Sequence, residues 1–187
     1  MKKTVSALLL LLGAMYYSQS SIFVFNNQNP HFDAVGRFFA GNIVPGNPVA
    51  MFASPNASYG TYTMPSGIYH KYITFDTTGG TGNIMDIDTW NVSDYLNPSN
   101  SGPYAYNDSY ITTDMNPNNE WAGFIFWLQD VSSGNTYDYF QVGNPSVASN
   151  IGFTVNTSQT GATTGVFSDW YTITSGSDQI TFFTIYP

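Results

Sequence analysis

Cysteine is absent from the 187-residue sequence, and histidine is limited to His31 and His70. The absence of cysteine excludes disulfides, thiolate metal sites and cysteine nucleophiles, although it does not by itself indicate a compartment. The two histidines lie in separate segments without the spacing of metal ligands. No Gly-x-Ser-x-Gly sequence nominates a serine nucleophile for either of them. We therefore expect a non-catalytic protein.

Charged residues are also scarce, at 9% of the sequence, and the formal net charge is −8 at pH 7. Nucleic acids and anionic lipid headgroups bind clustered Lys and Arg, which this chain lacks, so we expect neither as a partner. Aromatic residues, in contrast, make up 17% of the sequence. A chain rich in aromatic and small polar residues and poor in charge is typical of an extracellular β-protein.

Residues 1–20 have the three-part pattern of a secretory signal peptide. Lys2 and Lys3 form a short basic start, residues 5–14 form an apolar run, and residues 18–20 are Ser-Gln-Ser at the expected cleavage site. The apolar run is shorter than the roughly 20 residues that a membrane-spanning helix needs. We expect a secreted or cell-surface protein whose mature chain does not insert into the membrane. A retained N-terminal anchor is the alternative.

The most apolar stretch of the expected mature chain is residues 120–130, with the sequence EWAGFIFWLQD. In an extended conformation alternate side chains point to opposite sides, so Trp121 is expected on the same face as Ile125 and Trp127. Both faces are apolar, which predicts a central strand. Turn residues at 132–135 and a β-prone segment at 136–143 then predict an antiparallel hairpin.

Other β-prone segments, separated by turn residues every 8 to 12 positions or so, extend over the rest of the chain. The sequence therefore predicts an all-β, mostly antiparallel β-sandwich, jelly-roll-like or immunoglobulin-like, as a single domain over residues 21–187. Residues 31–41 fit either a short helix or a twisted strand. The further strands are expected at 21–25, 49–53, 60–64, 68–75, 83–90, 151–156, 166–174 and 179–186.

A long polar interval, residues 91–119, is the segment in which we expect ligand binding, because long loops in compact domains often carry binding sites. Exposed aromatic rings beside amides and carboxylates can stack on sugar rings and hydrogen-bond their hydroxyls. Packing into a β-core is the alternative role for such rings. The candidate ligand-binding residues are Trp90, Tyr95, Tyr104, Tyr106 and Tyr110.

The same interval ends in a candidate calcium site. Asp114, Asn116, Asn118 and Glu120 offer oxygen ligands at alternate positions, as calcium-binding loops do. The pattern is not an EF-hand, because its glycine is missing, Pro117 interrupts it and the Glu comes too early. An ordinary Asn-rich turn is the alternative. Glu120 is also the only Glu of the chain, and paired with an Asp it could serve a glycan-cleaving enzyme.

The expected mature chain begins with a β-prone segment that includes Ile22, Phe23, Val24 and Phe25. Such a segment pairs within its own domain or completes the sheet of a neighbouring subunit. The leading functional hypothesis is a secreted or cell-surface adhesion or binding protein, whose partner is a glycan or another protein. The alternatives are a self-assembling structural subunit that pairs through residues 21–27, and a small glycan-cleaving enzyme.

Overall fold

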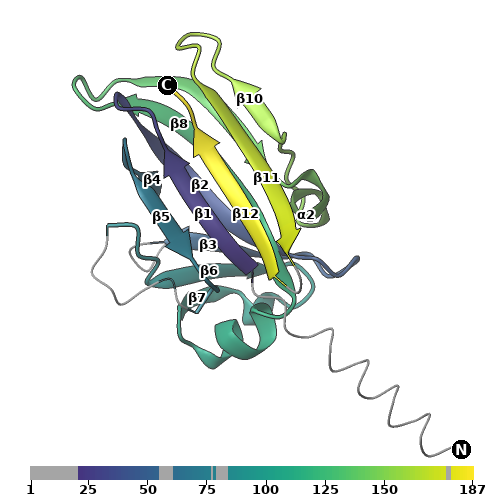
Figure 1. Cartoon of the computed structure of the whole chain (residues 1–187). Helices are drawn as coiled ribbons and strands as arrows, with labels where there is room; N and C mark the ends of the chain where they lie inside the picture. The colour runs from purple at the N-terminus through teal and green to yellow at the C-terminus, as the bar shows by residue number, and fades with distance from the viewer. Residues whose placement is uncertain (1–20, 55–60, 77, 79–83, 176–177) are drawn as a thin grey trace, which may run out of the picture.

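The computed structural model describes residues 21–54, 61–76, 78, 84–175 and 178–187 (Figure 1). The predicted signal peptide lies outside these residues. The described chain forms two packed sheets of mostly antiparallel strands, which confirms the predicted all-β sandwich. Among the described helices, none combines the length and the apolar character that a membrane span requires.

Sheet A contains the first and the last of the described strands, which lie side by side near its centre. The order of sheet A is β10 (Ser158–Thr160), β11 (Phe167–Ser175), β12 (Asp178–Ile185), β1 (Ser21–Asn27) and β5 (Tyr69–Tyr72). β1 pairs in parallel with β12 on one edge and antiparallel with β5 on the other. Its two phenylalanines, Phe23 and Phe25, point into the core and are fully buried.

Sheet B is built around two long strands that pair antiparallel, β2 (Phe32–Asn42) and β8 (Asn119–Asp130). The segment that fitted either a helix or a strand is therefore a strand, β2. The order is β7 (Gly102–Ala105), β6 (Thr89–Asp94), β3 (Val49–Ser54), β2, β8 and β9 (Thr136–Gly143), and β4 (Tyr62–Met64) also pairs with β2. The described helices are η2 (Pro98–Asn100), η3 (Tyr110–Met115) and α2 (Pro145–Asn150).

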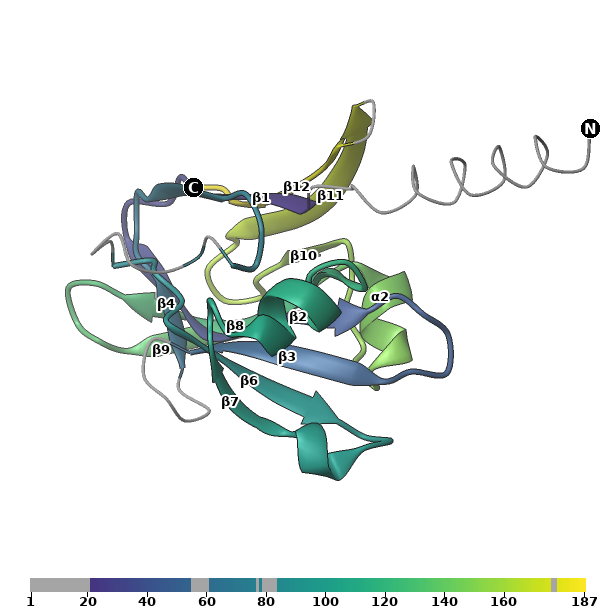
Figure 2. The ribbon, with the colours of Figure 1, turned by 90° about the horizontal axis from the view of Figure 1, so that it is seen from below.

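The space between the sheets is filled mainly by aromatic rings. Phe38 of β2 stacks on Trp121 of β8 with ring centroids 4.9 Å apart, and Phe25 of β1 meets Phe38 edge-on at 4.6 Å. A second, smaller cluster lies on the outer side of sheet B, where α2 and the chain after it cover Phe39 and Ile125. The outer side of sheet B is therefore only partly covered (Figure 2).

A β-bulge changes the side to which Trp121 points. Phe39 lies opposite Gly123 and the next residue, Ala40, lies opposite Trp121, so Ala122 is an extra residue on β8. The extra residue shifts the inward and outward alternation of side chains by one position, so residues of β8 before the bulge point to the opposite face from the one that strict alternation predicts. Trp121 consequently packs in the main core, whereas Ile125 belongs to the outer cluster. The expectation that these two side chains share a face was wrong for this reason.

The β8–β9 hairpin forms as predicted, and the Asp130 carboxylate organises its turn. Its Oδ1 accepts hydrogen bonds from the backbone N–H groups of Ser132 and Ser133 at 2.9 and 2.7 Å, and from their hydroxyls at 2.6 and 3.0 Å. The Ser132 hydroxyl, followed by the Ser133 N–H, lowers the pKa of Asp130 from 3.8 to about 2. The turn is therefore stabilised by a charged group that is partly exposed to solvent.

We expect the stabilisation by Asp130 to disappear in acid. A carboxyl with a lowered native pKa stabilises the fold above its unfolded pKa, here about 4, and this contribution is lost as the pH falls through about 2. Urea unfolding of the wild type and Asp130→Ala between pH 2 and 7 should show a difference that narrows below pH 4. Asp88→Ala, at an exposed position outside the turn, is the control. A difference that stays constant down to pH 2 would contradict this explanation.

Candidate functional site

Trp90, the first of the five predicted ligand-binding aromatics, lies in the core. Its side chain is 0% exposed, and its indole Nε1 donates a hydrogen bond to the carbonyl of Phe75 at 3.1 Å. Trp90 is opposite Ala53 on β3, in the interior of sheet B. The expectation that its ring faces solvent was wrong, because β6 runs on to Asp94 and continues the sheet into the interval expected to be loop.

The four tyrosines do not form a single exposed platform. Tyr104, Tyr106 and Tyr110 are half-buried and pack against the main core. The rings of Tyr104 and Tyr110 lie 4.9 Å apart, and the Tyr104 hydroxyl donates to the carbonyl of Asn100 at 2.9 Å. Tyr95 is 55% exposed and lines a separate groove with Phe153. Three of the four tyrosine rings therefore pack against the core, whereas the ring of Tyr95 lies at the surface.

The four predicted calcium ligands lie where η3 leads into β8: Asp114 in η3, Asn116 and Asn118 in the connection, and Glu120 in β8. Asn116 Oδ1 accepts a hydrogen bond from the Phe75 N–H at 3.3 Å, and Asn118 Nδ2 donates to the carbonyl of Asp114 at 2.8 Å. Burial raises the pKa of the Glu120 carboxyl, and a hydrogen bond with Gln179 opposes this rise. Within the described part of the chain, no three His, Asp or Glu side chains gather as a metal centre would require. Calcium binding stays a prediction of the sequence.

The predicted assembly strand, Ile22 to Phe25, lies in β1, which has a neighbour on each edge. Val24 is opposite Phe182 of β12 and Lys71 of β5, so both edges of the strand are paired within its own chain. Assembly through this strand would require it to leave its own sheet. Self-assembly also stays a prediction of the sequence.

Two exposed aromatic rings lie side by side on the outer face of sheet B. Trp127 of β8 is 48% exposed and Tyr139 of β9 is 43% exposed. They are cross-strand partners, and their ring centroids are 4.9 Å apart with an interplanar angle of 44°. The other three tryptophans are at most 3% exposed. Trp127 is therefore the tryptophan whose ring is broadly exposed to solvent.

These rings border a groove of about 390 Å³. Arg37 of β2 is exposed beside the rings and forms no ion pair with a described residue, so its guanidinium donors are free to meet a ligand. Ile125 and the backbone at Gly36 line the apolar part. The groove, named here the Trp127 groove, is lined by Gly36, Arg37, Thr61, Ile125, Trp127, Tyr139 and Phe153.

A second bulge positions Tyr139. Trp127 is opposite Tyr139 whereas Leu128 is opposite Tyr137, so Asp138 is an extra residue on β9, and it has a φ of +32°. Its carboxylate accepts hydrogen bonds from the N–H groups of Thr163 and Thr164 at 2.9 and 2.8 Å and from the Thr164 hydroxyl at 2.7 Å. Burial raises the pKa of Asp138, but these bonds outweigh it and lower the pKa overall. The loop 161–166 thus fixes the bulge that aligns the two rings.

The sequence contains only a weak signal for this site. A strand that is apolar on both faces predicts that Trp127 is covered, although Arg37 and Gln129 suggest that one side of this region meets water. Tyr137, Tyr139 and Gln141 occupy alternate positions, which similarly indicates that one face of β9 meets water. The pairing of Trp127 with Tyr139 depends on the bulge at Asp138, which no local sequence pattern predicts.

Comparison with known proteins identifies no relative: no family model matches the chain, and neither a curated protein nor a solved structure is significantly similar to it. Function must therefore be inferred from the geometry of the sites described above.

Proposed function

We propose that the protein is a non-catalytic glycan-binding protein of the cell surface or the extracellular space, and that the Trp127 groove is its binding site. The observation that carries the proposal is the exposed pair of Trp127 and Tyr139 rings beside Arg37. Aromatic faces stack on the C–H faces of sugars, and guanidinium N–H groups donate to hydroxyl or acetamido oxygens.

The shape and the charge of the groove support a sugar over other ligands. A volume of about 390 Å³ is within the range of small-molecule sites and suits one or two sugar rings. A single Arg and an acidic chain are poorly suited to a polyanion such as nucleic acid, whose binding requires several cations. The signal-peptide pattern of residues 1–20 supports an exterior location, where glycans are abundant.

We expect Trp127→Ala to weaken glycan binding by at least about tenfold, because it removes a stacking surface whose loss costs on the order of 1.4 kcal/mol or more. A glycan array would first identify the sugar, and calorimetric titration would then compare the wild type with the variant. Tyr69→Ala is the matched control, because Tyr69 is 65% exposed on β5 of the other sheet.

Two outcomes of this comparison would contradict the proposal. One is the absence of binding to every sugar on the array. The other is an affinity that Trp127→Ala leaves unchanged while thermal unfolding shows the variant to be folded. The Tyr69→Ala control should bind as the wild type does, because its ring lies outside the Trp127 groove.

A further inference from the structure

The edges of the two sheets differ in how well they are protected against pairing with another chain. β5 carries Lys71, and β7 contains Pro103, and both features discourage strand addition. β9 is interrupted by the bulge at Asp138, and the Gln159 side chain bonds its exposed backbone, accepting from Gln141 N–H at 3.0 Å and donating to Tyr139 C=O. These three edges are blocked or interrupted.

The edge formed by β10 and β11 is open along part of its length. β10 covers β11 only from Phe167 to Asp169, and the last contact is Trp170 N–H to the carbonyl of Thr157 at 2.7 Å. Alternate residues of a strand direct their N–H and C=O groups to the same edge, so Thr172 and Thr174 present theirs beyond the end of β10. No described strand pairs with them there.

The sequence of this open edge favours strand pairing. Residues 170–174 are Trp-Tyr-Thr-Ile-Thr, which are β-prone and include no charge, Pro or Gly. Natural sheets usually protect an edge with one of these features. In Figure 2 the far end of β11 rises away from sheet B.

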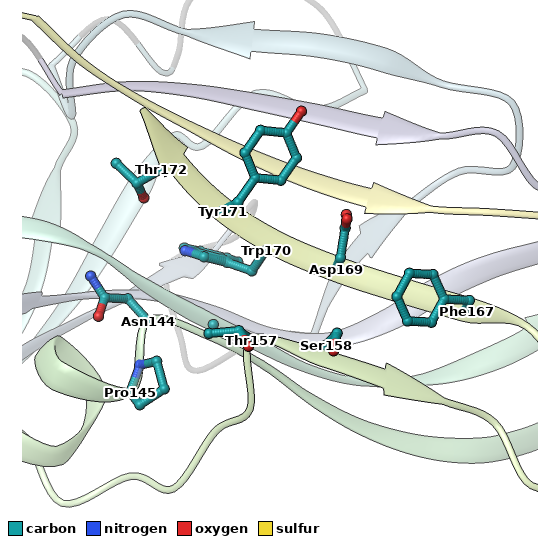
Figure 3. A pocket seen from close by; sticks show the side chains of 10 residues that line it. Asn144, Pro145, Thr157, Ser158, Phe167, Asp169, Trp170, Tyr171 and Thr172 are labelled. Atoms are coloured by element: carbon teal, nitrogen blue, oxygen red, sulfur yellow. The ribbon is translucent and has the colours of Figure 1, made fainter. Parts of the chain in front are cut away.

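A cavity of about 550 Å³ lies against the same edge, between β11 and the start of α2 (Figure 3). Trp170 and Asn144 both line it, together with Pro145, Thr157 and Thr172. The side chain of Trp170 is 3% exposed, yet its indole Nε1 has no hydrogen-bond partner among the described residues. A buried N–H donor without an acceptor is costly, and a ligand that supplies an oxygen there removes the cost.

Asn144 supplies a second donor on the same side of β11. Its Oδ1 accepts the N–H of Ser146 at 3.1 Å, which leaves the Nδ2 group for a ligand. In Figure 3 Asn144 lies on the same side of β11 as Trp170, whereas the side chain of Asp169, which also lines the cavity, points to the other side of β11. Two side-chain donors therefore line the cavity beside the open backbone of Thr172.

We propose that an extended, uncharged peptide segment of another protein binds in this cavity by adding a strand to β11. Its backbone would pair with the N–H and C=O groups of Thr172 and Thr174, and one of its carbonyl oxygens would accept from Trp170 Nε1. A regularly spaced row of donors and acceptors matches another polypeptide backbone better than it matches a sugar. An acidic partner is disfavoured, because the open edge lacks positive charge and the chain has a net charge of −8.

The probe for this proposal is the capped peptide acetyl-Ser-Thr-Val-Thr-Val-Ser-amide, which is uncharged and β-prone. It would be titrated into the ¹⁵N-labelled protein up to about 5 mM, where a Kd of about 1 mM gives mostly bound protein. The expected result is a saturable shift of the Trp170 indole N–H and of the Thr172 and Thr174 amides. The Trp127 indole N–H should not move, which separates this site from the Trp127 groove.

Three variants make the test specific. Thr172→Pro removes an N–H that points out of the sheet, which an edge strand tolerates, and should weaken peptide binding by at least about tenfold. Thr172→Val keeps this N–H and should bind as the wild type does. Trp170→Phe removes the indole donor and should also weaken binding, which provides a second readout if the proline variant does not fold.

Four outcomes would overturn the proposal. They are no shift at the highest peptide concentration, a shift confined to the Trp127 indole, equal peptide binding by folded Thr172→Pro and Thr172→Val, and shifts of Thr172 and Thr174 that appear when the protein alone is concentrated. The last would assign the edge to a second copy of this chain. Each outcome can be obtained without knowledge of the glycan, so this proposal can fail while the proposed function holds.

Discussion

Gly36→Ala is expected to destabilise the protein by about 3 kcal/mol or more, the upper end of the cost of overpacking. β2 and β8 approach closely at Gly36, where an added Cβ would lie 2.5 Å from Phe126 Cα and closer still to the carbonyl oxygen of Ile125. Both obstacles are backbone atoms of the neighbouring strand. They can give way only if the central β2–β8 pairing shifts, so urea unfolding should show a large loss of stability.

Gly41→Ala provides the matched control on the same strand. An added Cβ there would lie 2.8 Å from Ile151 Cδ1, which is the far end of a flexible side chain. A rotation of Ile151 relieves this contact, so we expect a cost of about 1 kcal/mol. Equal losses for the two variants would show that the close approach of β2 and β8 at Gly36 is not a constraint on the fold.

Phe25→Ala is expected to cost about 3–5 kcal/mol, the usual range for a large aromatic side chain removed from a core. Phe25 is 0% exposed and its ring meets Phe38 at 4.6 Å, Phe183 at 5.7 Å and Tyr72 at 5.8 Å. Phe25 thus packs against rings of both sheets in the shared core. Chemical denaturation measures the loss, and Ile22→Ala, on the opposite and partly exposed side of β1, should lose less.

The same measurement tests the assembly alternative. If β1 pairs within its own chain, the unfolding midpoints of the wild type and of Phe25→Ala are independent of protein concentration. If β1 instead fills the sheet of a second copy, both midpoints rise with concentration, because association stabilises the folded state by mass action. A concentration-dependent midpoint would therefore contradict the position of β1 in its own sheet.

The sandwich and the β8–β9 hairpin were predictable because they follow from local signals. Alternating or continuous apolar runs between turn residues identified most strands, and the turn at 132–135 set the pairing of β8 with β9. Segment 144–156 was less predictable. Its expected strand at 151–156 is only an isolated bridge from Asn156 to Val142, and Asn144 instead caps the short helix α2 through its bond with Ser146 N–H.

The candidate site was not predictable from the sequence, since it depends on contacts between distant segments. The bulge at Ala122 moves Trp121 inward, and the bulge at Asp138 brings Tyr139 opposite Trp127. α2 covers Ile125 on the outer face but leaves Trp127 exposed. Which rings meet solvent thus follows from two register shifts and the position of one helix, and the sequence alone had favoured Trp90 over Trp127.

Tryptophan fluorescence tests the glycan-binding proposal most directly, because only one of the four tryptophans is open to solvent. Trp127 is 48% exposed, whereas Trp90, Trp121 and Trp170 are 0%, 2% and 3% exposed, so acrylamide should quench mainly Trp127. We predict that a saturating sugar reduces the quenching of Trp127 fluorescence by acrylamide. The variant Trp127→Phe should lack this quenched fluorescence, and the sugar should not change the quenching that remains. Quenching that is the same with and without a sugar known to bind would contradict the assignment of the Trp127 groove.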